Sequence, residues 1–173
     1  CLDKTGTITE GKMSVEKVLY YGDHQSEIDD LIAFIVSRDE EQNMSTLALQ
    51  SKFQTPQKSY DLVHYLPFSS ELKLQAMEIS GQGTYLLGAF DLIVPELSAE
   101  VKAEIDQSLT AGYRIIGLAH SSGHLTDQTV PKDAVLLALI LIKDVVKEDA
   151  RDIIAYFKSQ DVDVKIISGD YPD

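Results

Sequence analysis

The sequence predicts an α+β fold in which helices flank an antiparallel sheet. Short β-type runs follow one another between residues 60 and 89, and the turns between them are short, as at residues 80–83. Strands joined by such short turns pair in the antiparallel direction. Around residues 144–173 the pattern changes to strand, helix and strand, which is typical of parallel α/β structure. We therefore expect an antiparallel body inserted between two small α/β segments at the ends of the chain.

The first third of the chain is predicted to form one strand and two helices. Residues 13–21 alternate loosely and are rich in Val and Tyr, which is typical of a strand. Apolar residues then recur at helical spacing between Ile28 and Ile35, and Ser26 just before them is the predicted N-cap. A second, short helix is predicted over residues 45–53.

The rest of the chain is predicted to contain most of the strands and two longer helices. Ser98 caps a helix whose apolar residues share one face and which ends at Gly112. A last helix is predicted over residues 147–159, and a last strand over residues 161–168. The other predicted strands cover residues 60–68, 72–79, 83–89, 113–121 and 134–142.

Composition excludes several classes of function. The 173-residue chain is 44% hydrophobic, which is enough to bury a core. Its formal net charge of -13 disfavours nucleic acids and anionic membrane surfaces as partners. Its single cysteine leaves no internal disulfide. The longest purely apolar run covers residues 134–142, whereas a membrane helix needs about 20 apolar residues. We expect that this chain itself does not contact a membrane.

The opening string CLDKTGTIT carries the strongest chemical signal. Asp3 stands at the end of a predicted strand and is followed by Lys4, Thr5, Gly6 and Thr7. A loop of small and hydroxylic residues can turn so that backbone N–H groups and hydroxyls point at a phosphate, while the Asp3 carboxylate attacks phosphorus. The alternative interpretation is an acidic turn capped by a threonine.

Residues 3–9 resemble, without a departure, the phosphorylation signature Asp-Lys-Thr-Gly-Thr-[Leu/Ile/Val]-Thr of the P-type ATPases, ion pumps that pass through a covalent aspartyl phosphate. The resemblance implies that Asp3 is the phosphorylated nucleophile and that Lys4 steadies the charge of the transferred group. Thr5 would bind Mg²⁺ through its carbonyl and the phosphate through its hydroxyl, and Asp3 would be a second Mg²⁺ ligand. Gly6 and Thr7 would complete this catalytic loop.

The same resemblance implies a host domain of the haloacid-dehalogenase type, a parallel α/β fold of which only two terminal stubs are present. In that fold the position of Thr5 usually holds a second Asp that helps water to hydrolyse the intermediate, so the threonine implies a longer-lived phosphoenzyme. Ser168, Gly169 and Asp170 resemble the Thr-Gly-Asp loop that contacts the phosphoryl group. Residues 144–147 resemble the Asp-Pro-x-Arg hinge. The implied domains are a phosphorylation-domain stub at 1–10, a nucleotide-binding domain at 11–143 and a second stub at 144–173.

Three further segments resemble the nucleotide-binding domain of this family. Residues 68–73 resemble its Phe-x-Ser-x-x-Lys segment, residues 87–89 its Lys-Gly-Ala and residues 112–114 its Gly-x-Arg. The resemblance implies ATP as the ligand. The implied contacts are Phe68, Lys73, Gly88 and Arg114.

These four residues have different expected roles. Phe68 would stack on adenine, while Lys73 and Arg114 would offer positive charge to the phosphates. Gly88 would let the backbone approach the ligand closely because it has no Cβ. The alternative is that Phe68 is a core residue at a strand end and Lys73 its solvated neighbour.

Some positions depart from the family pattern, and others are expected to have no role in binding or catalysis. Leu87 replaces a lysine that contacts ATP in many relatives, and Thr46 stands where many relatives have an acidic residue facing the adenine amine. The acidic residues 39–41 are expected to form a solvated loop. His120 and His124 could be a metal pair, but a turn between strands explains their spacing.

We expect from this resemblance the ATP-binding cytosolic part of a cation pump that forms an aspartyl phosphate and couples ATP hydrolysis to transport at the cytoplasmic face of the cell membrane. Ca²⁺ is the first candidate for the transported cation. Residues 1–173 alone are expected to show no ATP turnover, because the family's Gly-Asp-Gly-x-x-Asn-Asp element does not occur in them. The alternatives are a haloacid-dehalogenase-type phosphatase with a large cap, and a non-catalytic nucleotide-binding module.

Overall fold

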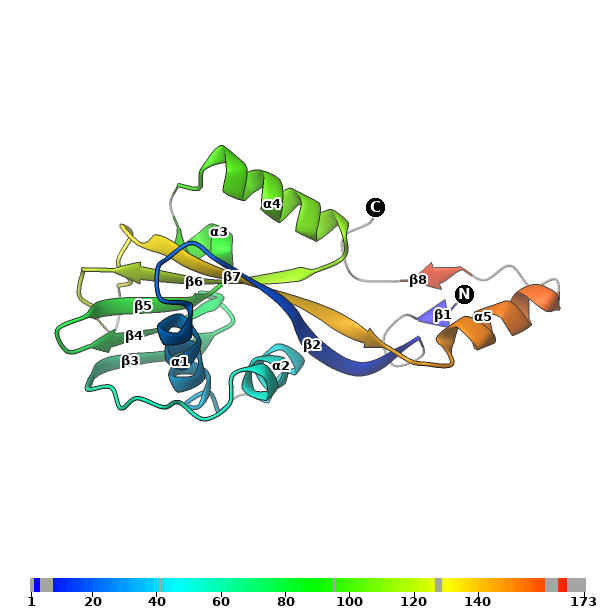
Figure 1. Ribbon diagram of the computed structural model, residues 1–173, viewed down its shortest axis with the longest axis horizontal. Helices are drawn as coiled ribbons and strands as arrows, with labels where there is room; N and C mark the ends of the chain where they lie inside the picture. Colours follow the sequence, from blue (N-terminus) through cyan, green and yellow to red (C-terminus); the bar gives the residue numbers. More distant parts are fainter. Residues whose placement is uncertain are drawn as a thin grey trace.

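The computed structural model describes residues 2–3, 8–40, 42–94, 96–126, 129–160 and 165–167. Its main body is a six-stranded antiparallel sheet with helices packed against it (Figure 1). The strand order is β2-β7-β6-β5-β4-β3, so every neighbouring pair except β2–β7 is consecutive in sequence. This order confirms the antiparallel sheet that the short turns predict. The strands are β2 (Thr9–Tyr20), β3 (Leu62–Ser69), β4 (Leu74–Ile79), β5 (Gly83–Gly88), β6 (Arg114–Ser121) and β7 (Val135–Val146).

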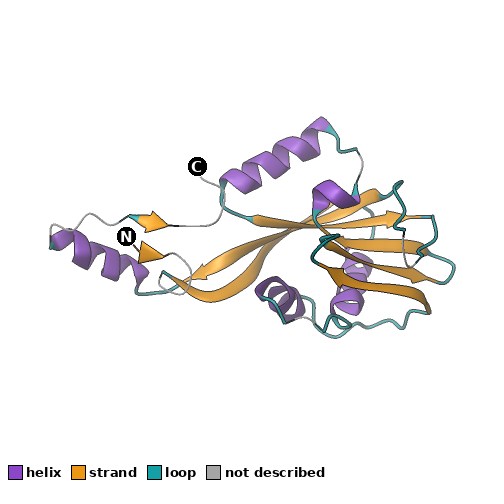
Figure 2. Cartoon of the chain, turned by 180° about the vertical axis from the view of Figure 1, so that it is seen from behind, coloured by secondary structure: helices purple, strands orange, loops and turns teal. Residues whose placement is uncertain are grey.

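Helices cover both faces of this sheet. Figures 1 and 2 show α1 (Gln25–Val36) and α2 (Met44–Lys52) on one face, with α3 (Phe90–Ile93) and α4 (Ala99–Thr110) on the other. Each face therefore has its own hydrophobic core. The core under α1 and α2 includes Ile32, Ile35, Met77, Ile79, Ile140 and Ile142, and the core under α3 and α4 includes Leu74, Ala76, Leu86, Ile93, Ile105 and Leu139.

Strand β4 shows how the sequence produces this double-sided sheet. All six of its residues are buried. Successive side chains of a strand point to opposite faces, so Leu74 and Ala76 enter one core while Met77 and Ile79 enter the other. A strand covered on both sides is apolar at nearly every position. The run LQAMEI fits this rule, with Gln75 and Glu78 as exceptions that reach polar partners.

The helix caps are partly as predicted. The Ser98 hydroxyl accepts a hydrogen bond from the Val101 N–H at 3.3 Å, which confirms the predicted cap of α4. The prediction for α1 is wrong, because that helix begins at Gln25 and Ser26 lies inside its first turn. Its N-cap is His24, which has a left-handed backbone (φ 65°) and makes no side-chain capping bond.

Strands β2 and β7 extend beyond the rest of the sheet and pair with each other as far as Thr9 and Val146. They lead to a small second part of the structure, seen at one end of Figures 1 and 2, with α5 (Ala150–Ser159) and a two-stranded sheet. In that sheet β1 (Leu2–Asp3) pairs in parallel with β8 (Ile166–Ile167). The two ends of the described chain therefore meet, as an inserted body requires.

Two further points concern the helices. The predicted helix at residues 147–159 begins at Ala150, and α3 was not predicted because four residues are too few to show a helical period. Every helix in the described ranges is too short or too polar to span a bilayer.

Candidate functional site

A cavity of about 690 Å³ opens on the α1/α2 side of the sheet, near the ends of β4, β5 and β6. Its volume falls within the range of small-molecule sites, about 300–1,000 Å³. The structure brings together here all four residues that the sequence predicts to contact a nucleotide. The lining includes Phe68, Lys73, Gly88 and Arg114, with Asp39, Thr46, Leu49, Gln75, Leu87 and Ile116 among the other residues.

A β-bulge places Phe68 in the cavity wall. Leu66 pairs with Ala76 and Ser69 pairs with Leu74, so Pro67 and Phe68 together oppose the single residue Gln75. A bulge re-aims the side chains of its strand, and it is a position where a strand tolerates proline. The half-buried Phe68 ring thereby lies across from Gln75 at the edge of the sheet.

The turn from β3 to β4 fixes Lys73 beside Gly88. Lys73 has a left-handed backbone (φ 53°), its N–H donates to the Ser69 carbonyl at 2.6 Å, and its carbonyl accepts from the Ala89 N–H at 2.9 Å. A Cβ at Gly88 would lie 2.4 Å from the Lys73 carbonyl oxygen and 2.5 Å from Leu74 Cα. The fold itself therefore requires glycine at position 88. A close approach of Gly88 to a ligand stays a prediction.

The cavity combines two positive charges with an apolar floor. Lys73 and Arg114 lie at its wall and both are exposed to solvent. Leu87 is 2% exposed and belongs to the core under α1 and α2. Leu87, in place of the lysine of many relatives, therefore adds apolar surface to the floor of the cavity and contributes no charge. This arrangement suits a ligand with one flat apolar part and one anionic part.

A group of hydrogen-bonded polar side chains closes another part of the wall. We call Asp39, Thr46 and Gln75 the Asp39 cluster. Asp39 Oδ2 accepts from the Thr46 hydroxyl at 3.0 Å and from the Gln75 side-chain amide at 3.4 Å. The Tyr65 hydroxyl in turn donates to Gln75 Oε1 at 3.3 Å. Burial raises the pKa of the Tyr65 hydroxyl, and the nearby Asp39 charge adds to this rise, so the hydroxyl stays protonated as a donor.

The expectation that residues 39–41 form a solvated loop is wrong for Asp39. Turn hydrogen bonds after α1, from the Arg38 N–H to Ile35 and from the Asp39 N–H to Val36, direct the Asp39 side chain toward α2. Asp39 is half-buried there, whereas Glu40 is exposed and Glu41 lies outside the described residues. Asp39 and Gln75 are among the cavity residues that the sequence did not reveal.

No protein-family model matches the chain. Over 178 residues it is 39% identical to the probable cation-transporting ATPase exp7 of Streptococcus pneumoniae, a match that covers 99% of this chain and 22% of that protein. Over 172 residues it is 30% identical to the calcium-transporting ATPase CtpE of Mycobacterium bovis, with 98% and 21% covered. The chain belongs to the P-type cation-transporting ATPases.

Solved structures agree with this assignment at the level of the fold. The chain superimposes on the crystal structure of a zinc-transporting PIB-type ATPase with a TM-score of 0.65 and 20% sequence identity, over 98% of this chain and 25% of that one. The chain spans about a fifth of the length of the curated P-type ATPase relatives it matches (22% and 21%).

The phosphorylation signature of P-type ATPases lies mostly outside the described residues. The backbone of Asp3 is described as part of β1, but its side chain is not. Lys4, Thr5, Gly6 and Thr7 lie outside the described part, as do Ser168, Gly169 and Asp170. Asp3 pairs with Ile167, and parallel strands have their carboxyl ends at the same edge of a sheet. The ends of β1 and β8, from which these two segments continue, therefore lie side by side.

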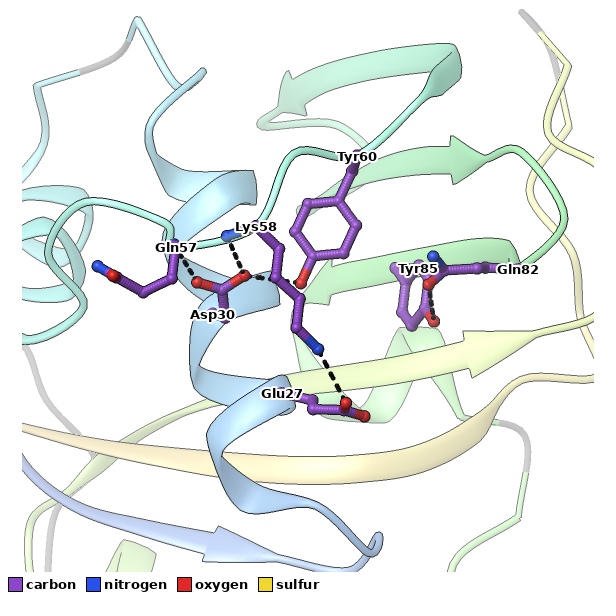
Figure 3. A network of polar contacts seen from close by, with 7 residues as sticks. All are labelled: Glu27, Asp30, Gln57, Lys58, Tyr60, Gln82 and Tyr85. Atoms are coloured by element: carbon purple, nitrogen blue, oxygen red, sulfur yellow. Dashed lines mark hydrogen bonds and ion pairs between the residues drawn. The ribbon is translucent and has the colours of Figure 1, made fainter.

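A polar network positions the strand of this P-type ATPase that carries Phe68. Figure 3 shows Asp30 on α1 accepting hydrogen bonds from the backbone N–H groups of Gln57 and Lys58 and from the Tyr60 hydroxyl, the last at 2.9 Å. Burial alone would raise the pKa of Asp30, but these hydrogen bonds outweigh it and lower the pKa. Lys58 also forms an ion pair with Glu27 at 2.8 Å. The segment that leads into β3 is thereby tied to α1.

His120 and His124, the pair considered as metal ligands, each contact an oxygen atom of another segment. A ring nitrogen of His120, Nε2, lies 2.6 Å from the Gln82 carbonyl oxygen, and His124 Nδ1 lies 2.6 Å from Glu78 Oε1. The Leu125 N–H donates to the other Glu78 oxygen at 2.9 Å. The hydrogen bond with His124, followed by the one from Leu125, lowers the pKa of Glu78. His120 therefore joins β6 to the turn between β4 and β5, and His124 helps to hold the segment after β6 against β4.

Proposed function

We propose that this chain is the ATP-binding cytosolic part of a P-type cation pump and that ATP binds in the cavity of Phe68. The observation that carries the proposal is the convergence of four residues from separate parts of the sequence. Phe68, Lys73, Gly88 and Arg114 belong to three motifs, and they line one cavity. Relatives named as cation-transporting ATPases favour a pump over the alternative of a phosphatase with a large cap.

Binding is expected to be weak. The Phe68 ring offers a flat face for adenine, and Lys73 and Arg114 offer charge-assisted hydrogen bonds to phosphates. Leu87 supplies no positive charge where many relatives have a lysine, and the net charge of -13 disfavours a polyanion at long range. We expect a dissociation constant on the order of 0.1 to 10 mM, equivalent to roughly 3 to 5 kcal/mol.

The chemistry that we propose for the intact pump is phosphoryl transfer to Asp3. A carboxylate oxygen of Asp3 forms a bond to the γ-phosphorus, the bond from that phosphorus to the bridging oxygen breaks, and ADP leaves with the electron pair. Lys4 would steady the charge, and the loops Gly6–Thr7 and Ser168–Asp170 would contact the phosphoryl group. Mg²⁺ would supply further positive charge when held by Asp3 and Thr5. These assignments rest on the sequence pattern.

The same proposal assigns the parts of the chain to two domains. Residues 11–143 form the nucleotide-binding domain, and residues 1–10 and 144–173 belong to the phosphorylation domain. Strands β1 and β8 support this division, because their pairing joins the two terminal segments. The host protein would lie in the cell membrane with these domains at its cytoplasmic face.

Ca²⁺ is our proposed cargo. The support is a relative at 30% identity that is named a calcium-transporting ATPase. Uptake of radioactive Ca²⁺ into inverted membrane vesicles containing the intact pump tests this proposal. ATP-dependent uptake that is lost in the Asp3→Asn variant would support it, and uptake of another cation in its place would contradict it.

A substitution at Phe68 tests the nucleotide site. If the ring stacks on adenine, Phe68→Ala weakens ATP binding by about 1 to 3 kcal/mol, as for bases stacked on aromatic side chains elsewhere. Tyr156→Ala is the matched control, because this ring is 63% exposed on α5 and lies outside the cavity. Calorimetric titration of both variants with ATP should show loss for Phe68→Ala alone. Equal binding by wild type and Phe68→Ala would contradict the site.

A further inference from the structure

Lys143 on β7 contacts the turn from which β6 begins. Its ammonium nitrogen donates a hydrogen bond to the Ala111 carbonyl at 3.2 Å and lies 4.9 Å from the centre of the Tyr113 ring. Ala111 is the C-cap of α4, and the residue after Tyr113 is Arg114, the first residue of β6. One side chain of a neighbouring strand thus holds both ends of the short turn that leads to Arg114 at the nucleotide cavity.

The register of the sheet places Lys143 and Arg114 on opposite faces. Arg114 pairs with Ile142 in the antiparallel ladder, so Lys143 lies across from Tyr113. Residues opposite each other share a face, whereas successive residues of a strand alternate between faces. Tyr113 packs against the core under α3 and α4, while Arg114 lines the cavity on the α1/α2 side. Lys143 is therefore outside the cavity lining, and it can influence a ligand there only through the turn or through long-range charge.

The end of α4 lacks a positive charge of its own. The last carbonyl groups of a helix have no intrahelical donor and carry a partial negative charge, which a nearby cation stabilises. The last turn of α4, which the structure describes in full, contains no basic residue. Backbone hydrogen bonds close the turn that follows, including one from the Tyr113 N–H to the Ser108 carbonyl at 3.1 Å. Lys143 adds the cation from β7, and its position over the Tyr113 ring is favourable for a cation–π contact.

We propose that Lys143 is a positioning residue that keeps Arg114 directed into the nucleotide cavity by holding the turn before it. This inference rests on the proposed ATP site, in which Arg114 offers its charge to the phosphates. Without Lys143, the Ala111 carbonyl and the Tyr113 ring lose their cation, so the turn and the start of β6 sample more conformations. ATP must then restrict this motion when it binds, which lowers its affinity. The base, which stacks on Phe68 from β3, is not coupled to this turn.

The test titrates the full chain carrying Lys143→Met with ATP while backbone amide shifts are recorded. Methionine keeps most of the apolar stem of lysine but has neither its charge nor its donor hydrogens. The helix-end and cation–π contacts of one exposed cation limit the expected loss of ATP affinity to about three- to tenfold. Adenosine, which has the base and no phosphate, should bind Lys143→Met and wild type alike. Lys143→Arg keeps the charge, the donors and the stacking on Tyr113, so it should retain wild-type affinity for ATP.

Lys17→Met is the matched control for charge. Lys17 is an exposed lysine on β2, the strand that neighbours β7, and it lies outside the cavity lining. Its substitution removes the same charge from the chain without touching the turn before Arg114. We expect less than about a twofold change in ATP affinity, because solvent and salt screen exposed charges at long range. A loss equal to that of Lys143→Met would mean that only long-range charge matters, and it would overturn the proposal.

The results that overturn the proposal differ from those that overturn the ATP site. If ATP binds wild type and Lys143→Met equally, the cavity holds nucleotide but Lys143 does not position Arg114. If Lys143→Met weakens ATP and adenosine by the same factor, the substitution disturbs the whole cavity, and the positioning role is wrong as well. If wild type shows no saturable shifts with ATP, the site itself is wrong and the inference about Lys143 is overturned with it.

Discussion

Replacement of Gly88 by alanine tests the geometry of the cavity at its most crowded point. The added methyl carbon would lie 2.4 Å from the Lys73 carbonyl oxygen and 2.5 Å from Leu74 Cα. Both are backbone atoms held by hydrogen bonding, since Leu74 pairs with Gly88 and the Lys73 carbonyl accepts from the Ala89 N–H, so neither can move away by a rotamer change. Overpacking of a core usually costs about 1 to 3 kcal/mol, and we expect Gly88→Ala near the upper end of that range.

The matched control is Gly22→Ala. A Cβ at Gly22 would meet only the side-chain methyl groups of Leu137 and Ile28, at 3.3 and 3.4 Å, and these can yield. We expect this variant to stay within about 1 kcal/mol of wild type, because a smaller unfolded-state entropy offsets the tight contact. Urea unfolding of the two variants measures both effects. A loss below about 0.5 kcal/mol for Gly88→Ala would refute the steric argument.

Three further predictions concern the body that carries the site. Ser98→Ala should lower the free energy of unfolding by about 0.5 to 2 kcal/mol and Ser26→Ala by less, because only Ser98 caps a helix; equal losses in urea titrations would contradict this. Tyr60→Phe removes a donor to a carboxylate of α1 and should cost about 1 to 3 kcal/mol in the same assay, and no loss would show that the tie to α1 is dispensable. The pKa of Glu78 is lowered by folding, so its stabilising contribution is present above its ordinary pKa of about 4.5 and is lost as the pH falls through the lower folded value. Between about pH 5 and 3, the melting temperature should therefore fall less steeply with decreasing pH for Glu78→Gln than for wild type. Identical slopes of melting temperature against pH would exclude the contribution of the contact with His124.

The fold could be predicted from local patterns because most of its elements bury a periodic apolar face. Strands β3 to β7 were found from composition and short turns, and the helix at Ser98 from its cap and apolar face. The errors lie where local chemistry is ambiguous. Ser26 has the side chain of an N-cap, yet α1 starts one residue earlier from a left-handed His24. Helix α3 has four residues and leaves no period to detect.

The candidate site could be predicted only where its residues belong to motifs. Phe68, Lys73, Gly88 and Arg114 were found through their neighbours in sequence, and the cavity unites them. Asp39 was missed because its contacts with Thr46 and Gln75 join segments 7 and 36 residues apart. A cluster of acidic residues in a loop is usually solvated, and only the path of the chain after α1 shows otherwise.

Titration of the chain with ATP, followed by backbone amide chemical shifts, tests the central claim most directly. The proposed site predicts saturable shifts that cluster on residues 66–75, 86–90 and 112–116, with a dissociation constant on the order of 0.1 to 10 mM. The bulge at Phe68, the turn at Lys73 and the start of β6 at Arg114 would then respond together. The absence of saturable shifts at about 20 mM nucleotide, a concentration above that range, or shifts confined to residues 1–9, would contradict an ATP site in this cavity.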